Sequence, residues 1–185
     1  MEKWHWNDLV KVEPRGKITF DVIKPYVSNS KNIFEASCGF APLCGYFNDK
    51  NYFAYDLSQI AIDDAKKRCP NGTFYVTDDK DFNKDLIIDT FIALGIGASK
   101  RPEESKTEAS TIIRLINKYN PKVIILEMCA SYYDDMMRHN KTHNWDIITK
   151  ELCNYSIIKE QTIDAQLERP IVSERIIRVY SNLRS

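Results

Sequence analysis

The sequence predicts an α/β protein with a doubly wound, mostly parallel seven-stranded sheet, helices on both faces and a C-terminal antiparallel hairpin. Short β-rich apolar segments alternate with segments of helical periodicity along most of the chain, which is typical of parallel strands joined by crossover helices. The segment 122–129, KVIILEMC, is almost entirely apolar, as expected of a strand buried on both faces. Two further β-rich segments, 155–166 and 174–182, close the chain and predict the hairpin.

The first half of the chain supplies three of the predicted strands, at residues 31–36, 51–55 and 73–77. A turn of small residues follows the first strand, and we expect a helix to begin near Pro42. Ser58 is a suitable N-cap for the next helix, which runs to about Arg68 and ends at the proline and glycine that follow.

The second half supplies the other four strands. We expect the fourth strand to begin at residues 85–88 and to end at residues 89–91, within an apolar run that continues until its two glycines. A helix then begins at Pro102, because proline and the acids after it suit a first helical turn, and it stops before Pro121. After the fifth strand we expect a helix over residues 145–153 and then the hairpin.

Length and composition favour one globular domain. The chain has 185 residues, and its apolar fraction of 43% is enough for a core and too high for disorder. We expect a capping segment over residues 1–30 and a single domain over residues 31–185. The 26 basic and 26 acidic side chains give a net charge of zero, which disfavours a protein that grips nucleic acid through a basic surface.

The sequence predicts neither a membrane partner nor a metal site. No apolar run approaches the roughly 18 residues of a membrane span, and the first residues lack the apolar stretch of a signal peptide. We therefore expect a cytoplasmic protein, whose five cysteines are free thiols. His139 and His143 could share a helix face, but the glutamate of an HExxH zinc motif is missing between them.

Candidate functional residues follow the predicted strands. In a doubly wound sheet the ligand lies at the carboxyl ends of the strands, where the strand order reverses. Small residues after Glu35 would let a nucleoside approach the backbone, next to the start of a helix. Asp56, which comes 17 residues after Gly39, can accept from both hydroxyls of a ribose. Asp78 and Asp79 end the third strand and can accept from an exocyclic amine.

The same residues form an ordered set of motifs. Residues 35–41, EASCGFA, have the form of an acid followed by a glycine-rich turn, with Gly39 kept and Ser37 and Ala41 in place of other glycines. The chain resembles the class I, Rossmann-like S-adenosylmethionine-dependent methyltransferases. The resemblance lies in this motif, in the acids after the second and third strands, in residues 84–88 and in the closing hairpin. The resemblance covers residues 31–182.

The resemblance implies that the cofactor is S-adenosylmethionine, the methyl donor. The residues that it implies for binding this cofactor are Glu35, Ser37, Gly39, Ala41, Asp56, Leu57, Ser58, Asp78, Asp79 and Asp89. The main rival ligand is a nicotinamide dinucleotide, but its GxGxxG motif is missing, since Gly39 and Gly45 are six residues apart with a proline between them. A methyltransferase-like binding or partner subunit that has lost catalysis is a further alternative.

Methyl transfer requires positioning, and a general base where the acceptor is a hydroxyl. The candidates for this base are Asp89 and Glu127, which we expect at the carboxyl ends of the fourth and fifth strands, and His139 and His143 in the polar segment that follows. The Asn/Asp-Pro-Pro-aromatic run of methyltransferases that act on amino groups of nucleic acids or glutamine is missing at residues 89–92. We therefore expect a small-molecule or metabolite acceptor, with a hydroxyl slightly favoured over an amine and an RNA or nucleoside acceptor as the alternative.

Overall fold

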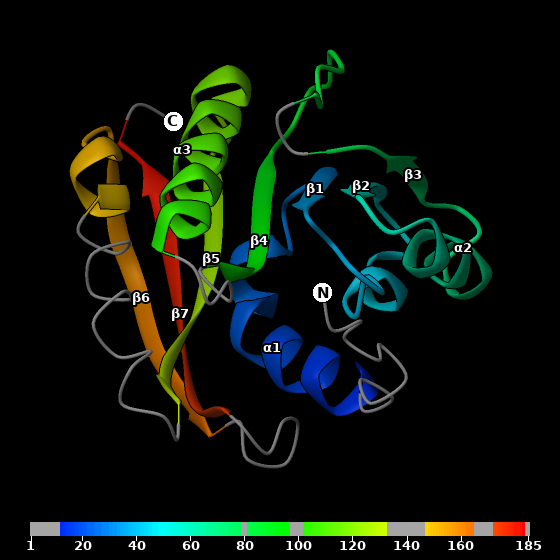
Figure 1. The fold of residues 1–185 in the computed structure, drawn as a ribbon, viewed down its shortest axis with the longest axis horizontal. Coiled ribbons are helices and arrows are strands. Elements are labelled where there is room, and N and C mark those ends of the chain that lie inside the picture. Colours follow the sequence, from blue (N-terminus) through cyan, green and yellow to red (C-terminus); the bar gives the residue numbers. More distant parts are fainter. Residues whose placement is uncertain (1–11, 79–80, 97–101, 133–146, 165–171, 184–185) are drawn as a thin grey trace.

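The computed structural model describes residues 12–78, 81–96, 102–132, 147–164 and 172–183 (Figure 1). Its helices are α1 (Val12–Val27), the 3-10 helix η2 (Cys44–Phe47), α2 (Gln59–Arg68) and α3 (Pro102–Tyr119). Its strands are β1 (Asn32–Ala36), β2 (Asn51–Asp56), β3 (Thr73–Val76), β4 (Thr90–Ile96), β5 (Val123–Tyr132), β6 (Tyr155–Asp164) and β7 (Val172–Asn182). A short helical segment also covers residues 147–151. None of the described helices is long and apolar enough to cross a membrane.

The seven strands form one sheet in the order β3-β2-β1-β4-β5-β7-β6. β1 to β5 are all parallel to one another, whereas β7 is antiparallel to both β5 and β6. This arrangement confirms the predicted doubly wound sheet with a closing antiparallel hairpin. The chain moves outward from β1 to β3 and then returns to β4 on the other side of β1, so the strand order reverses between β1 and β4.

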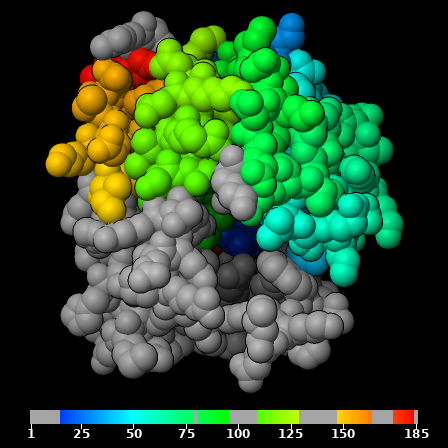
Figure 2. Space-filling model, turned by 45° about the horizontal axis from the view of Figure 1, so that its top comes forward, coloured from blue at the N-terminus to red at the C-terminus, as the bar shows by residue number. Residues whose placement is uncertain are grey.

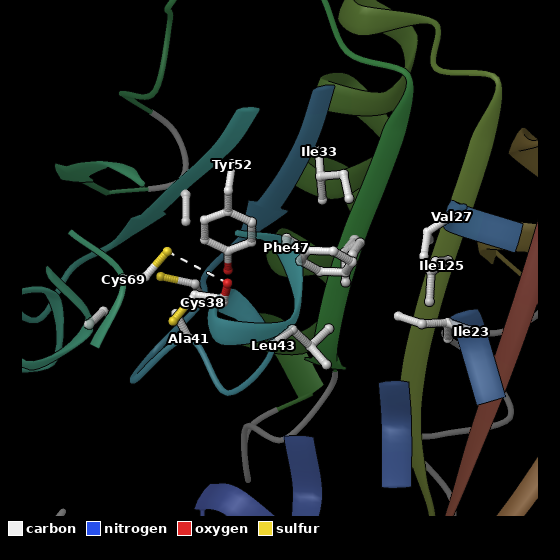
Figure 3. Packing of buried hydrophobic residues seen from close by; sticks show 14 of the residues in the cluster. Ile23, Val27, Ile33, Cys38, Ala41, Leu43, Phe47, Tyr52, Cys69 and Ile125 are labelled. Atoms are coloured by element: carbon white, nitrogen blue, oxygen red, sulfur yellow. Dashed lines mark hydrogen bonds between the residues drawn. The ribbon is translucent and has the colours of Figure 1, made fainter. Parts of the chain in front are cut away.

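Helices cover both faces of the sheet, as predicted. On one face, α3 and the segment 147–151 bury apolar side chains against β1, β4 and β5. On the other face, α1 packs against β5, whereas η2 and α2 lie over β2 and β3, and Figure 3 shows part of this second core. Ile23 and Val27 of α1 meet Ile125 of β5 there, and both α1 residues are almost fully buried. Side chains alternate along a strand, and Ile33 and Ile125 belong to this second core. Glu35 and Glu127, each two residues further along, therefore point to the same face as α1.

Two predicted elements were placed wrongly. The chain after the first turn forms the 3-10 helix η2 and not a helix beginning near Pro42. The fourth strand begins at Thr90, so residues 85–88 precede it and Asp89 lies at its amino end, not at its carboxyl end.

Asp89 holds neighbouring strands together at the amino edge of the sheet. Its carboxylate accepts from the backbone amides of Lys31 (3.0 Å) and Asn32 (2.9 Å) and pairs with the Lys122 ammonium at 3.1 Å. Burial raises the pKa of Asp89, but the bonds from Asn32, Lys122 and Lys31 outweigh burial and lower the pKa overall. Asp89 therefore links neighbouring strands at the edge of the sheet opposite to the carboxyl ends of β1, β2 and β3.

Helix α1 packs closely on the loop after β1. A Cβ added at Gly16 would lie 2.3 Å from the backbone oxygen of Pro42, so only glycine allows this approach. Phe20 of α1 stacks on Tyr46 of η2 with ring centroids 4.5 Å apart. The loop after β1 is thus packed between the sheet and α1.

Gly16→Ala is expected to destabilise the protein by about 1–3 kcal/mol, because the new methyl group must displace backbone atoms. At an unobstructed position in a helix, the same change would stabilise by about 0.5–1 kcal/mol. Gly45→Ala is the matched control, since a Cβ at Gly45 would meet no atom within 4 Å. Urea unfolding of both variants measures the difference, and equal stabilities would contradict the close packing of α1 on this loop.

Candidate donor-binding site

The loop after β1 has a left-handed backbone at alternate residues. Ser37, Gly39 and Ala41 have φ values of 48°, 52° and 47°. Non-glycine residues rarely adopt this conformation, which costs about 1–2 kcal/mol. The two positions at which the family motif has glycine and this chain has serine or alanine therefore keep the backbone that glycine favours. A Cβ at Gly39 would meet nothing within 4 Å, so there is open space against the loop.

Asp56 joins this loop to the end of β2. One carboxylate oxygen of Asp56 accepts from the backbone amide of Gly39 at 2.7 Å, and the other accepts from the amide of Ser58 at 2.8 Å. The Ser58 side chain caps α2 by accepting from the amide of Ala61. Each carboxylate oxygen has a second lone pair, so Asp56 can still accept two hydrogen bonds from a ligand.

Most of the other residues predicted to bind the cofactor lie near the contact between Asp56 and the loop after β1. Leu57 follows Asp56 and is 71% exposed. Asp78 comes just after β3, and the amide of Thr77 beside it donates to the backbone oxygen of Asp56 at 3.0 Å. The structure thus brings the ends of β1, β2 and β3 together, whereas Asp89 lies at the opposite edge and Asp79 lies outside the described residues.

Glu35 is a buried acid at the carboxyl end of β1. Its side chain is almost fully buried, and one oxygen accepts a hydrogen bond from the Tyr52 hydroxyl. Burial raises the pKa of Glu35 to about 7, although the Tyr52 bond and the nearby Arg15 lower it. A carboxyl group with this pKa gains from a cationic ligand, because the ligand replaces the solvation that burial removed.

This pKa predicts a pH-dependent loss of stability. The pKa of Glu35 is raised from 4.5 to about 7 on folding, so between these pH values the unfolded chain has released a proton that the folded chain keeps. Stability from this group is therefore present below pH 4.5 and falls as the pH rises to 7, by about 3 kcal/mol. Glu35→Gln should abolish this fall. The free energy of unfolding of the variant, measured with urea, should therefore increase relative to that of the wild type as the pH rises from 4.5 to 7. A difference between variant and wild type that does not change with pH would contradict the assignment.

Glu127 is at the centre of a buried ion cluster. It lies within β5, five residues before the end of the strand, and its side chain is fully buried. One oxygen is 2.5 Å from the Arg15 guanidinium of α1, and the other pairs with Arg175 of β7. Arg175 is also 3.4 Å from the Thr19 hydroxyl of α1. This cluster ties α1 to the sheet.

The predictions for a general base are therefore corrected in two cases. Asp89 lies at the wrong edge of the sheet, and Glu127 is not at a strand end and is committed to two arginines. His139 and His143 lie outside the described residues. Asp89 and Glu127 are both held in ion pairs away from the carboxyl ends of β1 and β2.

Three residues of this region were missed by the sequence analysis: Arg15, Tyr52 and Arg175. One pattern could have revealed Arg175, because it alternates with Ile177 and Val179 on the buried face of β7. A charge at a buried position predicts an opposite charge nearby, and Glu127 occupies such a position in β5. For Arg15 and Tyr52 we find no sequence signal.

The fold has clear relatives among solved structures. Magnesium protoporphyrin IX methyltransferase from Synechocystis PCC 6803, with bound SAH, has a TM-score of 0.68 at 13% identity, with 98% of this chain and 88% of that chain covered. The N-methyltransferase NodS from Bradyrhizobium japonicum WM9, in complex with S-adenosyl-L-homocysteine (SAH), has a TM-score of 0.67 at 13% identity, with 97% and 91% covered.

A third structure is a protein from E. coli that is described as a prophage-encoded DNA modification methyltransferase. Its TM-score is 0.60 at 14% identity, and the match covers 82% of this chain. This chain spans about half (46%) of the length of that protein. No family model matches the sequence, and the comparison with curated proteins finds no match. The chain therefore has the class I, Rossmann-like methyltransferase fold, as its motifs predict.

Proposed function

We propose that the protein is an S-adenosylmethionine-dependent methyltransferase. The observation that carries the proposal is the Asp56 carboxylate, which bridges the amides of Gly39 and Ser58 at the carboxyl ends of β1 and β2. This position lies beside the reversal of strand order, where doubly wound sheets bind their ligands. Its remaining lone pairs suit the two adjacent hydroxyls of a ribose.

The residues present fit the rest of the donor. The open space against Gly39 leaves room for a ligand to lie on the loop backbone. Asp78 follows Thr77, whose amide donates to the backbone oxygen of Asp56, and in the proposed complex it accepts from the adenine amine. Glu35, whose pKa is about 7 because it is buried, is suited to the donor's ammonium group. The donor supplies a methyl group on a sulfonium, and the protein contributes the orientation of that group toward the acceptor.

Calorimetry with SAH, the demethylated donor product, tests this proposal. We expect binding with a dissociation constant in the micromolar range and a rise in the midpoint of thermal unfolding. A nicotinamide dinucleotide is the matched control, because it shares the adenosine but requires a pyrophosphate site. Binding of the dinucleotide without binding of SAH would overturn the proposal in favour of an oxidoreductase.

For the acceptor, we propose a small molecule or metabolite. The net charge of zero supports this choice, because a nucleic-acid substrate is usually held by an excess of basic side chains. A hydroxyl acceptor, slightly favoured over an amine, needs a general base, and His139 and His143 are the remaining candidates from the sequence. An RNA or nucleoside acceptor is the alternative.

Transfer of label from methyl-labelled donor distinguishes the acceptors. A metabolite extract is expected to gain label, and total RNA is expected to gain none. Label in RNA would overturn the small-molecule proposal but not the methyltransferase. If SAH binds and no pool gains label, the chain is a binding subunit that has lost catalysis.

A further inference from the structure

Tyr52 and Glu35 form a buried hydrogen-bonded pair that joins the first two strands. In the register of the sheet, Tyr52 of β2 lies opposite Ile33 of β1, and Ala54 lies opposite Glu35. The tyrosine ring spans this diagonal, and its hydroxyl donates to one carboxylate oxygen of Glu35. Glu35 is 1% exposed and Tyr52 is 2% exposed. Tyr52 therefore brings a hydroxyl donor from near the start of β2 to the carboxyl end of β1.

The charge of Glu35 depends on several groups that surround it. The titratable and charged groups that act on Glu35 from the neighbouring elements are Arg15 of α1, Cys38 of the loop after β1, Cys44 of η2, Tyr52 and Asp56 of β2, and Glu127 of β5. Burial has the largest effect and raises the pKa of Glu35 to about 7, whereas the hydrogen bond from Tyr52 has the next largest effect and lowers it. Both thiols stay protonated at pH 7, because burial raises their pKa values.

The pair lies next to the loop on which the donor is proposed to bind. Figure 3 shows the Tyr52 hydroxyl directed toward Cys38 of this loop. Figure 2 shows a hollow in one face of the molecule, with the start of α1, in dark blue, visible at its floor. Arg15, at this start of α1, is one of the groups that act on Glu35. A carboxylate that accepts one bond from Tyr52 has further lone pairs that can accept from a ligand.

We propose that Tyr52 is a positioning residue for the methyl donor, whose hydroxyl keeps Glu35 oriented and ionised to bind the donor's ammonium group. This inference rests on the proposed function and adds a residue of β2 that lies outside the motif after β1. Tyr52 is buried, so it acts through Glu35 and does not contact the donor. Phenylalanine at this position would fill the same space but would leave Glu35 without the donor hydroxyl.

Donor binding is then coupled to the release of a proton. The pKa of Glu35 is about 7, so about half of the free protein carries a proton on this carboxyl group at pH 7. An ammonium group binds the ionised form, so the proton passes to the solvent when the donor binds. One hydrogen bond to a charged group corresponds to about one to two pH units. In Tyr52→Phe, half-ionisation of Glu35 should therefore require a pH higher by about this amount.

Calorimetry with SAH at pH 7 and pH 9 tests this coupling. Tyr52→Phe should bind SAH about 5- to 50-fold more weakly than wild type at pH 7, and within about threefold of wild type at pH 9. Titrations at pH 7 in two buffers of different ionisation enthalpy count the protons released. About one proton should leave per SAH bound to the variant, against about half a proton for wild type.

Three controls restrict the effect to the ammonium group and to Glu35. Tyr180→Phe should keep the wild-type affinity at both pH values, because Tyr180 is 1% exposed but lies in the core on the other face of the sheet. 5′-Methylthioadenosine keeps the adenosine and sulfur of SAH but has no ammonium group, and wild type and Tyr52→Phe should bind it equally. In a Glu35→Gln background, Tyr52→Phe should have no pH-dependent effect on SAH binding.

The outcomes separate the inference from the function on which it rests. If Tyr52→Phe weakens SAH by the same factor at both pH values, or weakens 5′-methylthioadenosine to the same extent, Tyr52 acts through the fold alone and the inference is wrong. If the variant binds SAH as wild type does at pH 7, the inference is again wrong while donor binding stands. If wild type binds neither nucleoside, the proposed function fails and the inference fails with it. Thermal unfolding of each variant shows whether the protein remains folded at the temperature of the titration.

Discussion

Replacing Asp56 by asparagine should weaken the binding of SAH about 100-fold. The carboxylate accepts from the backbone amides of Gly39 and Ser58, and in the proposed complex it also accepts from both ribose hydroxyls. Hydrogen bonds to a charged group contribute about 1.5–3 kcal/mol each. An asparagine keeps one acceptor oxygen and has an NH2 group in place of the other, so one of the two backbone amides loses its acceptor, and the hydroxyls no longer bind a charged group.

Asp63→Asn is the matched control for this measurement, since Asp63 is an exposed acid on α2 that accepts from the Gln59 side chain one turn earlier. Its affinity for SAH should stay within about twofold of wild type. Calorimetry at a temperature well below the unfolding midpoint of both variants separates lost binding from lost structure. Unchanged affinity of Asp56→Asn would move the ribose away from the end of β2.

Replacing Glu127 by glutamine should lower the free energy of unfolding by about 3–5 kcal/mol, which is a large part of the stability of most domains. The substitution keeps the shape of the side chain but removes the negative charge between Arg15 and Arg175. Two guanidinium groups then face each other across a neutral amide, and Arg175 has almost no access to water. Denaturant unfolding by circular dichroism measures the loss.

Glu160→Gln provides the comparison, because Glu160 forms its ion pair with Arg178 on the exposed side of the same hairpin. An exposed pair contributes about 0–1 kcal/mol, so this variant should differ little from wild type. Combining Glu127→Gln with Arg175→Met should recover part of the lost stability, since the double variant no longer buries the uncompensated charge. Equal stabilities of Glu127→Gln and Glu160→Gln would show that the buried cluster is not required for the fold.

The start of β4 explains why Asp89 was predicted at the wrong end of a strand. Residues 86–88 are as apolar as the strand that follows, yet Ile87 is 83% exposed and Ile88 is buried. An apolar run alone does not reveal where the first backbone bonds to a neighbouring strand form. Here the backbone of Asp89 bonds to Asn32 and Lys122 at the edge of the sheet, and these bonds set the boundary.

The site at β1 and β2 was more predictable, because its residues are local in sequence. An acid, small residues and a second acid at the next strand end must meet when two parallel strands lie side by side. Gly39 and Asp56 are 17 residues apart and are joined directly. The left-handed backbone at Ser37 and Ala41 could not be derived from residue type, since these residues favour other conformations.

The sequence by itself determined the order of the elements, the doubly wound sheet and the acids at the ends of β1, β2 and β3. Periodicity and turn residues act over a few residues, so they can be read from the chain without a structure. Only the tertiary structure decided that Glu127 lies between two arginines, 112 residues from Arg15 and 48 from Arg175. Such contacts depend on strand register and on how α1 packs on the sheet, and neither can be derived from a short segment of the sequence.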